Sequence, residues 1–169
     1  ILEKGREKFE RGRFSSANRI FKKISKDYPL TQAAGEARFL SARIHMQRGQ
    51  FVRAHTRLQE IVFNNPDYPK FGAVISAQFQ CATALMEGAR PKIFFILPGF
   101  RLHGEAMKQF EFVVANAPYS DYAPLALMNI ALIAERQKEP ELAIDALDRG
   151  EGLEGAFAWA LPILLAGLS

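Results

Sequence analysis

Two stretches of the chain share one pattern: GRFSSANRIFKKISKDYP at residues 12–29 and GQFVRAHTRLQEIVFNNP at residues 49–66. Six positions correspond at a constant shift of 37 residues, and they hold a glycine, an aromatic residue, an alanine, two apolar residues and a proline. In the first stretch these are Gly12, Phe14, Ala17, Phe21, Ile24 and Pro29. In the second they are Gly49, Phe51, Ala54, Leu58, Ile61 and Pro66. A constant spacing of this length is typical of a repeat architecture.

The pattern returns twice more, less completely. A third copy follows 52 residues after the second, and a fourth follows 37 residues after the third. Their matching residues are Ala106, Phe110, Val113 and Pro118, and then Pro140, Ala143 and Leu147. The longer third interval indicates an insertion, which we place at about residues 89–102.

Each position has a physical role in a pair of antiparallel helices. The glycine ends the first helix in a left-handed conformation, the alanine lies where two helices meet closely, and the proline ends the second helix. We expect first helices at residues 2–11, 31–48, 71–87 and 121–138. We expect their N-caps and those of the second helices to include Ser15, Thr31 and Ser120. The chain is therefore predicted to be all-α, a right-handed α-solenoid of about four helix pairs.

Composition narrows the class of protein further. The chain has 169 residues, of which 49% are hydrophobic and 24% charged, as in an ordinary globular protein. Cys81 is the only cysteine, which excludes an internal disulfide or a thiolate zinc cluster. Residues 1–70 carry 15 Lys and Arg against 7 Asp and Glu, whereas residues 71–169 carry 7 against 11. This asymmetry indicates either binding to acidic partners or anionic lipid headgroups, or solvated helix faces.

Patterns of catalysis are missing from the sequence. His45, His55 and His103 are not spaced as metal ligands, and no glycine-rich loop is present to hold a phosphate. Aromatic and basic residues do not alternate as they do on nucleic-acid-binding surfaces. We therefore expect a protein that is not an enzyme, needs no cofactor or metal, and binds no nucleic acid.

The repeat resembles the tetratricopeptide repeat, a helix–turn–helix unit of 34 residues. The turns between repeats carry a second pattern, YPLTQAAGEA at residues 28–37 and APYSDYAPLA at residues 117–126. Turns of this form, together with an insertion in the third repeat, resemble those of the bacterial outer-membrane β-barrel assembly lipoproteins (BamD- or YfiO-like). The resemblance covers residues 1–150.

This resemblance implies a protein–protein interaction scaffold at the periplasmic face of the bacterial outer membrane. Its partners would be barrel precursors and other assembly subunits, and its only link to the membrane a lipid anchor upstream of this chain. Two alternatives remain open: another periplasmic adaptor for cell-wall or division proteins, and a cytosolic co-chaperone adaptor. A co-chaperone adaptor needs a clamp of Lys, Asn and Arg on successive first helices. The corresponding positions here include Leu2, Arg6 and Leu40, so the clamp is absent or badly degraded.

Tetratricopeptide-type solenoids bind extended segments in a groove lined by the first helix of each pair. The repeat geometry places these residues near that groove: Arg6, Phe9, Phe39, Arg43, Met46, Gln47, Gln78, Leu85 and Met128. The resemblance implies that Arg6 and Arg43 pair with the terminal carboxylate of a barrel precursor, while Phe39 and Met46 receive its terminal aromatic residue. The alternative is that Phe9, Phe39 and Leu85 belong to the core.

Two further segments depart from the repeat. The insertion carries Phe94, Phe95 and Phe100 among prolines and basic residues, so we expect it either to contact a partner or a membrane surface, or to fill the groove. After Leu147 the pattern ends, and residues 151–169 form a divergent apolar tail. Its apolar run at residues 156–168 is shorter than the roughly 20 residues of a membrane-spanning helix.

Overall fold

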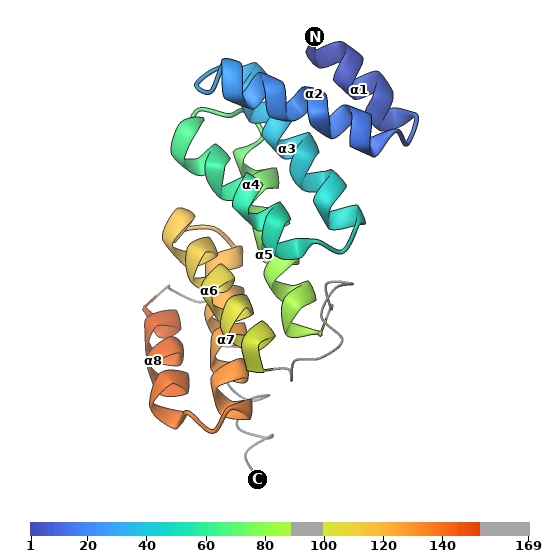
Figure 1. Ribbon diagram of the computed structural model, residues 1–169. Coiled ribbons are helices and arrows are strands. Elements are labelled where there is room, and N and C mark those ends of the chain that lie inside the picture. Colours follow the sequence, from blue (N-terminus) through green and yellow to red (C-terminus); the bar gives the residue numbers. More distant parts are fainter. Residues whose placement is uncertain (89–99, 153–169) are drawn as a thin grey trace.

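The computed structural model describes residues 1–88 and 100–152. Regular structure in these two ranges is entirely α-helical, and no helix among them is long and apolar enough to cross a membrane. The helices are α1 (Leu2–Glu10), α2 (Phe14–Asp27), α3 (Gln32–Gln47), α4 (Phe51–Asn64), α5 (Phe71–Met86), α6 (Phe100–Asn116), α7 (Tyr122–Arg136) and α8 (Pro140–Glu151). Figure 1 shows them stacked in chain order, with α1 at one end and α8 at the other.

The packing of the helices is that of a solenoid. Each helix contacts mainly the helix before it and the helix after it in the chain. Further contacts join alternate helices: α1 with α3, α4 with α6, and α5 with α7. The predicted α-solenoid of four helix pairs is therefore confirmed, with first helices α1, α3, α5 and α7 and second helices α2, α4, α6 and α8.

Left-handed residues end the first helices, as predicted for Gly12 and Gly49. Gly12, Gly49 and Gly88 follow α1, α3 and α5 with φ angles of 70°, 68° and 88°. After α7 the same conformation is taken by Lys138, with φ 61°. The first helices end one or two residues earlier than expected, because this turn takes up their last predicted residues.

Small and large apolar residues that recur at the same spacing in each repeat form the core. Ala17, Ala54 and Ala106 are fully buried, and one turn further along the same helices so are Phe21, Leu58 and Phe110. In α8 the corresponding Ala143 is only half-buried, whereas Ala146 is fully buried. Helices α2, α4 and α6 each end two residues before a proline, in agreement with the predicted helix stops.

Of the three predicted N-caps, one is confirmed and two are wrong. The Thr31 hydroxyl accepts a hydrogen bond from the backbone N–H of Ala34 at 3.2 Å, which caps α3. Ser15 lies inside α2, because that helix already begins at Phe14. Ser120 instead donates its hydroxyl to the carbonyl of Ala117 at 2.8 Å, within the turn before α7.

Candidate protein-interaction surface

Six of the predicted binding residues lie on the first helices of the first two repeats, and one of them, Gln47, is the last residue of α3. We call the other five the α1–α3 surface, and they are Arg6, Phe9, Phe39, Arg43 and Met46. Helix α1 packs against α3, so the residues on α1 and those on α3 lie close together. On α3, the last three of these residues follow each other at spacings of four and three, which places them on one face of the helix.

Arg43 is the exposed cation of this surface. Its guanidinium carbon lies over the ring of Phe9, 5.6 Å from the ring centroid. The Phe9 ring packs in turn edge-to-face on Phe14, at 5.7 Å between centroids. Among the described residues, no carboxylate lies within 4.0 Å of Arg43. The cation–π contact therefore orients a guanidinium whose N–H donors remain available to an acceptor.

Apolar side chains flank this guanidinium along α3. Phe39 and Met46 are both half-buried and pack against the core cluster that contains Leu58 and Val74. The ring of Phe39 also lies 6.1 Å from that of Tyr68. Aromatic and arginine side chains in partly desolvated surroundings are the residues that most often dominate protein interfaces.

Arg6 is held in a cluster around one carboxylate. Glu36 on α3 lies 3.2 Å from Arg6 on α1 and 3.1 Å from the Lys70 ammonium, and it accepts a hydrogen bond from the Tyr68 hydroxyl. Burial by itself would raise the pKa of Glu36. The hydrogen bonds from Tyr68 and Lys70 and the charges of Lys70 and Arg6 outweigh burial and lower this pKa. Arg6 is therefore already paired, and we no longer expect it to bind a ligand carboxylate.

Sequence reasoning missed Glu36, Tyr68 and Lys70. Gly35 explains how the ring of Tyr68 reaches its position: a Cβ at residue 35 would lie 3.0 Å from the Cδ2 atom of that ring. Gly35, inside the turn predicted at residues 28–37, was the sequence signal that another residue packs closely against the backbone there.

Two predicted groove residues are wrong. Gln78 is fully buried, and its amide donates to Gln59 Oε1 at 2.7 Å and accepts from Asn116 Nδ2 at 3.0 Å. Leu85 is buried in the core with 1% of its surface exposed. Gln78 therefore faces the second helices α4 and α6, and Leu85 belongs to a core cluster with residues of α6 and α7.

The remaining predicted residues are scattered. Gln47 is exposed at the end of α3, and Met128 on α7 is half-buried against the core of the last two repeats. Phe94 and Phe95 lie outside the described residues, as does the side chain of Phe100, the first residue of α6. The divergent tail lies outside them from residue 153 onward.

Two kinds of reactive site, a metal centre and a nucleophilic thiol, can be checked in the part of the chain that the structure describes. Residues 1–88 and 100–152 contain no group of three His, Cys, Asp or Glu side chains that could hold a metal ion. Burial raises the pKa of the Cys81 thiol to about 12, so the side chain stays protonated at neutral pH and is a poor nucleophile.

Comparison with known families agrees with this geometry. Residues 8–77 match a family model described as tetratricopeptide repeat, and residues 102–155 match a second model of the same description. Together the two matches cover well over half of the chain. No curated protein matches it. The chain belongs to the tetratricopeptide-repeat family, whose repeats serve as scaffolds that bind proteins or peptides.

Proposed function

We propose that this protein is an adaptor that captures an extended protein segment on the α1–α3 surface. The observation that carries the proposal is the exposed Arg43, which lies over Phe9 and between the half-buried Phe39 and Met46. A segment that ends in an aromatic residue with a free carboxylate fits this arrangement. Its carboxylate pairs with the guanidinium, and its ring packs on the apolar side chains.

We further propose that the captured segments are the carboxyl-terminal ends of outer-membrane barrel precursors. The support is the pair of proline-containing turns and the insertion at about residues 89–102, both of which resemble the barrel-assembly lipoproteins. In this proposal the protein acts at the periplasmic face of the bacterial outer membrane as a non-enzymatic subunit.

The terminal carboxylate makes a direct test possible. Two fluorescent peptides of identical sequence ending in Phe, one with a free carboxylate and one with an amide, are titrated with the whole chain. We expect the carboxylate peptide to bind about tenfold more tightly, because it alone makes a charge-assisted hydrogen bond. In the Arg43→Gln variant this preference should disappear.

Arg19→Gln is the matched control. Arg19 is exposed on α2, outside the α1–α3 surface, and its replacement changes the net charge by the same amount. The control should keep the preference for the carboxylate. The proposal fails if the unmodified chain binds both peptides equally, or if Arg19→Gln removes the preference as completely as Arg43→Gln.

A further inference from the structure

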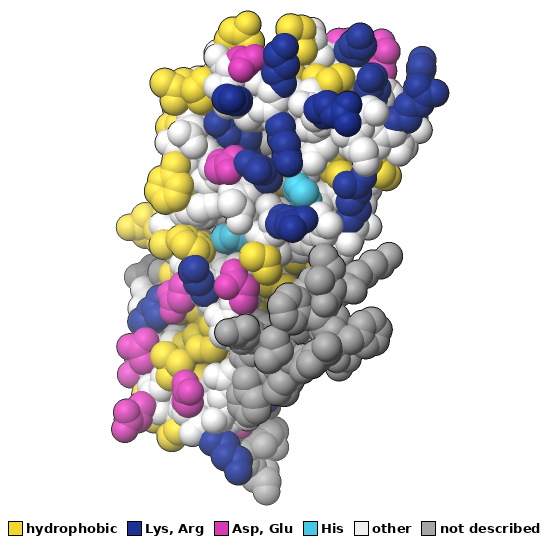
Figure 2. Space-filling model, viewed as in Figure 1, with side chains coloured by type: hydrophobic (Ala, Val, Ile, Leu, Met, Phe, Trp, Pro, Cys, Tyr) yellow, Lys and Arg dark blue, Asp and Glu magenta, His cyan; other side chains and the backbone are white. Residues whose placement is uncertain are grey.

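A second polar feature lies between α2 and α4, away from the α1–α3 surface. It is a pocket of about 240 Å³ lined by Lys22 and Ser25 of α2, Ser41 of α3 and Arg57 of α4. Lys22 and Arg57 are cationic, whereas the hydroxyl of Ser25 already donates to the carbonyl of Phe21 at 2.9 Å. In Figure 2, Lys and Arg side chains gather over the N-terminal half of the molecule on the face where α2 and α4 lie.

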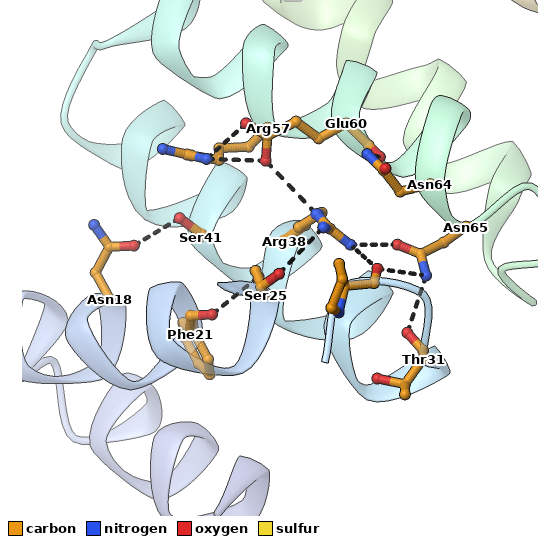
Figure 3. Close-up of polar contacts among 11 residues, drawn as sticks. Asn18, Phe21, Ser25, Thr31, Arg38, Ser41, Arg57, Glu60, Asn64 and Asn65 are labelled. Atoms are coloured by element: carbon orange, nitrogen blue, oxygen red, sulfur yellow. Dashed lines mark hydrogen bonds and ion pairs between the residues drawn. The ribbon is translucent and has the colours of Figure 1, made fainter. Parts of the chain in front are cut away.

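The floor of this pocket is polar although it is buried. Ser41 has 2% of its surface exposed, and its hydroxyl donates to Asn18 Oδ1 at 2.6 Å. Figure 3 shows the Ser41 hydroxyl facing Asn18 of α2, with Arg57 of α4 nearby. One turn further along α3, the Nδ1 atom of the buried His45 lies 2.7 Å from Gln50 Oε1. Helices α2, α3 and α4 thus meet here through polar side chains.

Positive charge in this region is only partly neutralised. Arg57 Nη1 donates to both carboxylate oxygens of Glu60, at 2.7 and 2.9 Å. The same carboxylate lies 3.6 Å from Nε of Arg38, which is 95% buried and has no acceptor for that N–H among the described residues. Figure 3 shows Glu60 between the two guanidinium groups. One carboxylate therefore serves two arginines, one of them little screened by water.

The surroundings of His45 show that a further cation, Arg53, acts in the same region as Lys22 and Arg57. Burial is the main cause that lowers the pKa of His45, and the hydrogen bond with Gln50 acts in the opposite direction. The charges of Arg57, Lys22 and Arg53 lower this pKa further. Three cations from two helices therefore raise the electrostatic potential beside Ser41, where a bound anion would be stabilised.

We propose that the pocket between α2 and α4 binds a phosphate group. Its two cationic side chains, Lys22 and Arg57, come from α2 and α4, so a bound phosphate group can pair with both. A phosphate monoester also carries a charge of about −1.5 to −2 near pH 7, which balances more of the excess positive charge than a carboxylate does. The phosphate group belongs either to a soluble molecule or to a lipid headgroup, and the experiment distinguishes these sources.

The test is a calorimetric titration of the whole chain with inorganic phosphate at constant ionic strength. We expect saturable binding that is weakened about tenfold by Lys22→Gln, because the ammonium group supplies a charge-assisted contact. Lys23→Gln is the matched control: this neighbouring lysine is also exposed on α2 but does not line the pocket. Both lysines are exposed, and melting curves of both variants verify that they fold.

Further probes identify the source of the group. Glycerol 3-phosphate represents soluble phosphate esters, and phosphatidylcholine vesicles with and without phosphatidic acid represent a lipid surface. Binding that depends on Lys22 supports the site with either kind of probe and assigns its source. The proposal is overturned if no probe saturates, if Lys22→Gln and Lys23→Gln weaken binding equally, or if acetate binds as tightly as phosphate. None of these outcomes bears on Arg43, so this site and the proposed adaptor function succeed or fail separately.

Discussion

Lys138 takes the turn position that Gly12, Gly49 and Gly88 hold in the other repeats, and its φ is 61°. A side chain in this left-handed conformation costs about 1 kcal/mol relative to glycine. We therefore expect Lys138→Gly to raise the free energy of unfolding by about 1 kcal/mol, measured by urea denaturation. Gly12→Ala should lower it by a similar amount, because no atom lies near its Cβ and only backbone strain is added. A stability loss in Lys138→Gly would contradict this explanation.

Gly5 sets how closely α1 approaches α2. A Cβ at this residue would lie 2.6 Å from Cε1 of the fully buried Phe21. We expect Gly5→Ala to lower the free energy of unfolding by about 1–3 kcal/mol through overpacking. Gly104→Ala in α6 is the matched control, since nothing lies within 4 Å of its Cβ and the change should be stabilising. Equal effects of the two substitutions would show that the contact with Phe21 is unimportant.

At the scale of the elements, His55 makes the packing of α4 against α6 sensitive to acid. Its ring lies 5.5 Å from that of Phe112, and its Nε2 has no hydrogen-bond partner among the described residues. Burial, with a smaller contribution from the charge of Lys108, lowers the pKa of His55 to about 4. The unfolded chain takes up this proton near pH 6.5, so the folded state loses stability as the pH falls from about 6.5 to 4.

Replacing His55 by phenylalanine should remove this pH dependence. The expected loss in the unmodified chain is about 3 kcal/mol over that range, at 1.36 kcal/mol per pKa unit. Urea denaturation at pH 7 and at pH 4.5 measures the stability difference between His55→Phe and the unmodified chain. We expect this difference to shift in favour of His55→Phe at the lower pH. A difference that is the same at both pH values would contradict the assignment.

A partly buried amide network, with Gln78 fully buried, joins α4, α5 and α6. Gln59, Gln78 and Asn116 exchange hydrogen bonds of 2.7 to 3.0 Å. Gln78→Leu would keep the side-chain size but remove the two hydrogen bonds that Gln78 makes with Gln59 and Asn116, so we expect a loss of about 1–3 kcal/mol in the free energy of unfolding. Binding of the carboxylate peptide should stay unchanged, measured by anisotropy. Weaker peptide binding without a loss of stability would contradict this assignment and indicate that Gln78 contacts the peptide.

The helices could be predicted from sequence because the repeat positions have steric requirements of their own. Glycine, alanine and proline recur where a turn, a close approach or a helix end requires them, and Thr31 caps α3 for similar local reasons. The rotation of each first helix could not be predicted in the same way. Gln78 faces inward and Arg6 is paired because their partners come from Asn116 and Glu36, on other helices. Such contacts depend on how the helices pack against one another, and the spacing of the repeat residues does not determine this packing.

At the scale of the whole molecule, both proposed binding sites lie in the first two repeats. The α1–α3 surface lies on first helices, and the pocket between α2 and α4 is bounded mainly by second helices. Residues 1–70, which contain both, carry the excess of Lys and Arg over Asp and Glu. Because helix pairs in a solenoid contact mainly their neighbours, changes at one end should leave the other largely unaffected.

The most direct measurement of the adaptor proposal is quantitative capture of outer-membrane barrel precursors from a cell-envelope extract. The unmodified chain is compared with a Phe39→Ala/Arg43→Ala double variant whose fold is verified by its melting curve. We predict that barrel precursors bind the unmodified chain and are lost from the double variant. Recovery of only division or cell-wall proteins, or equal recovery of precursors by both chains, would contradict the account.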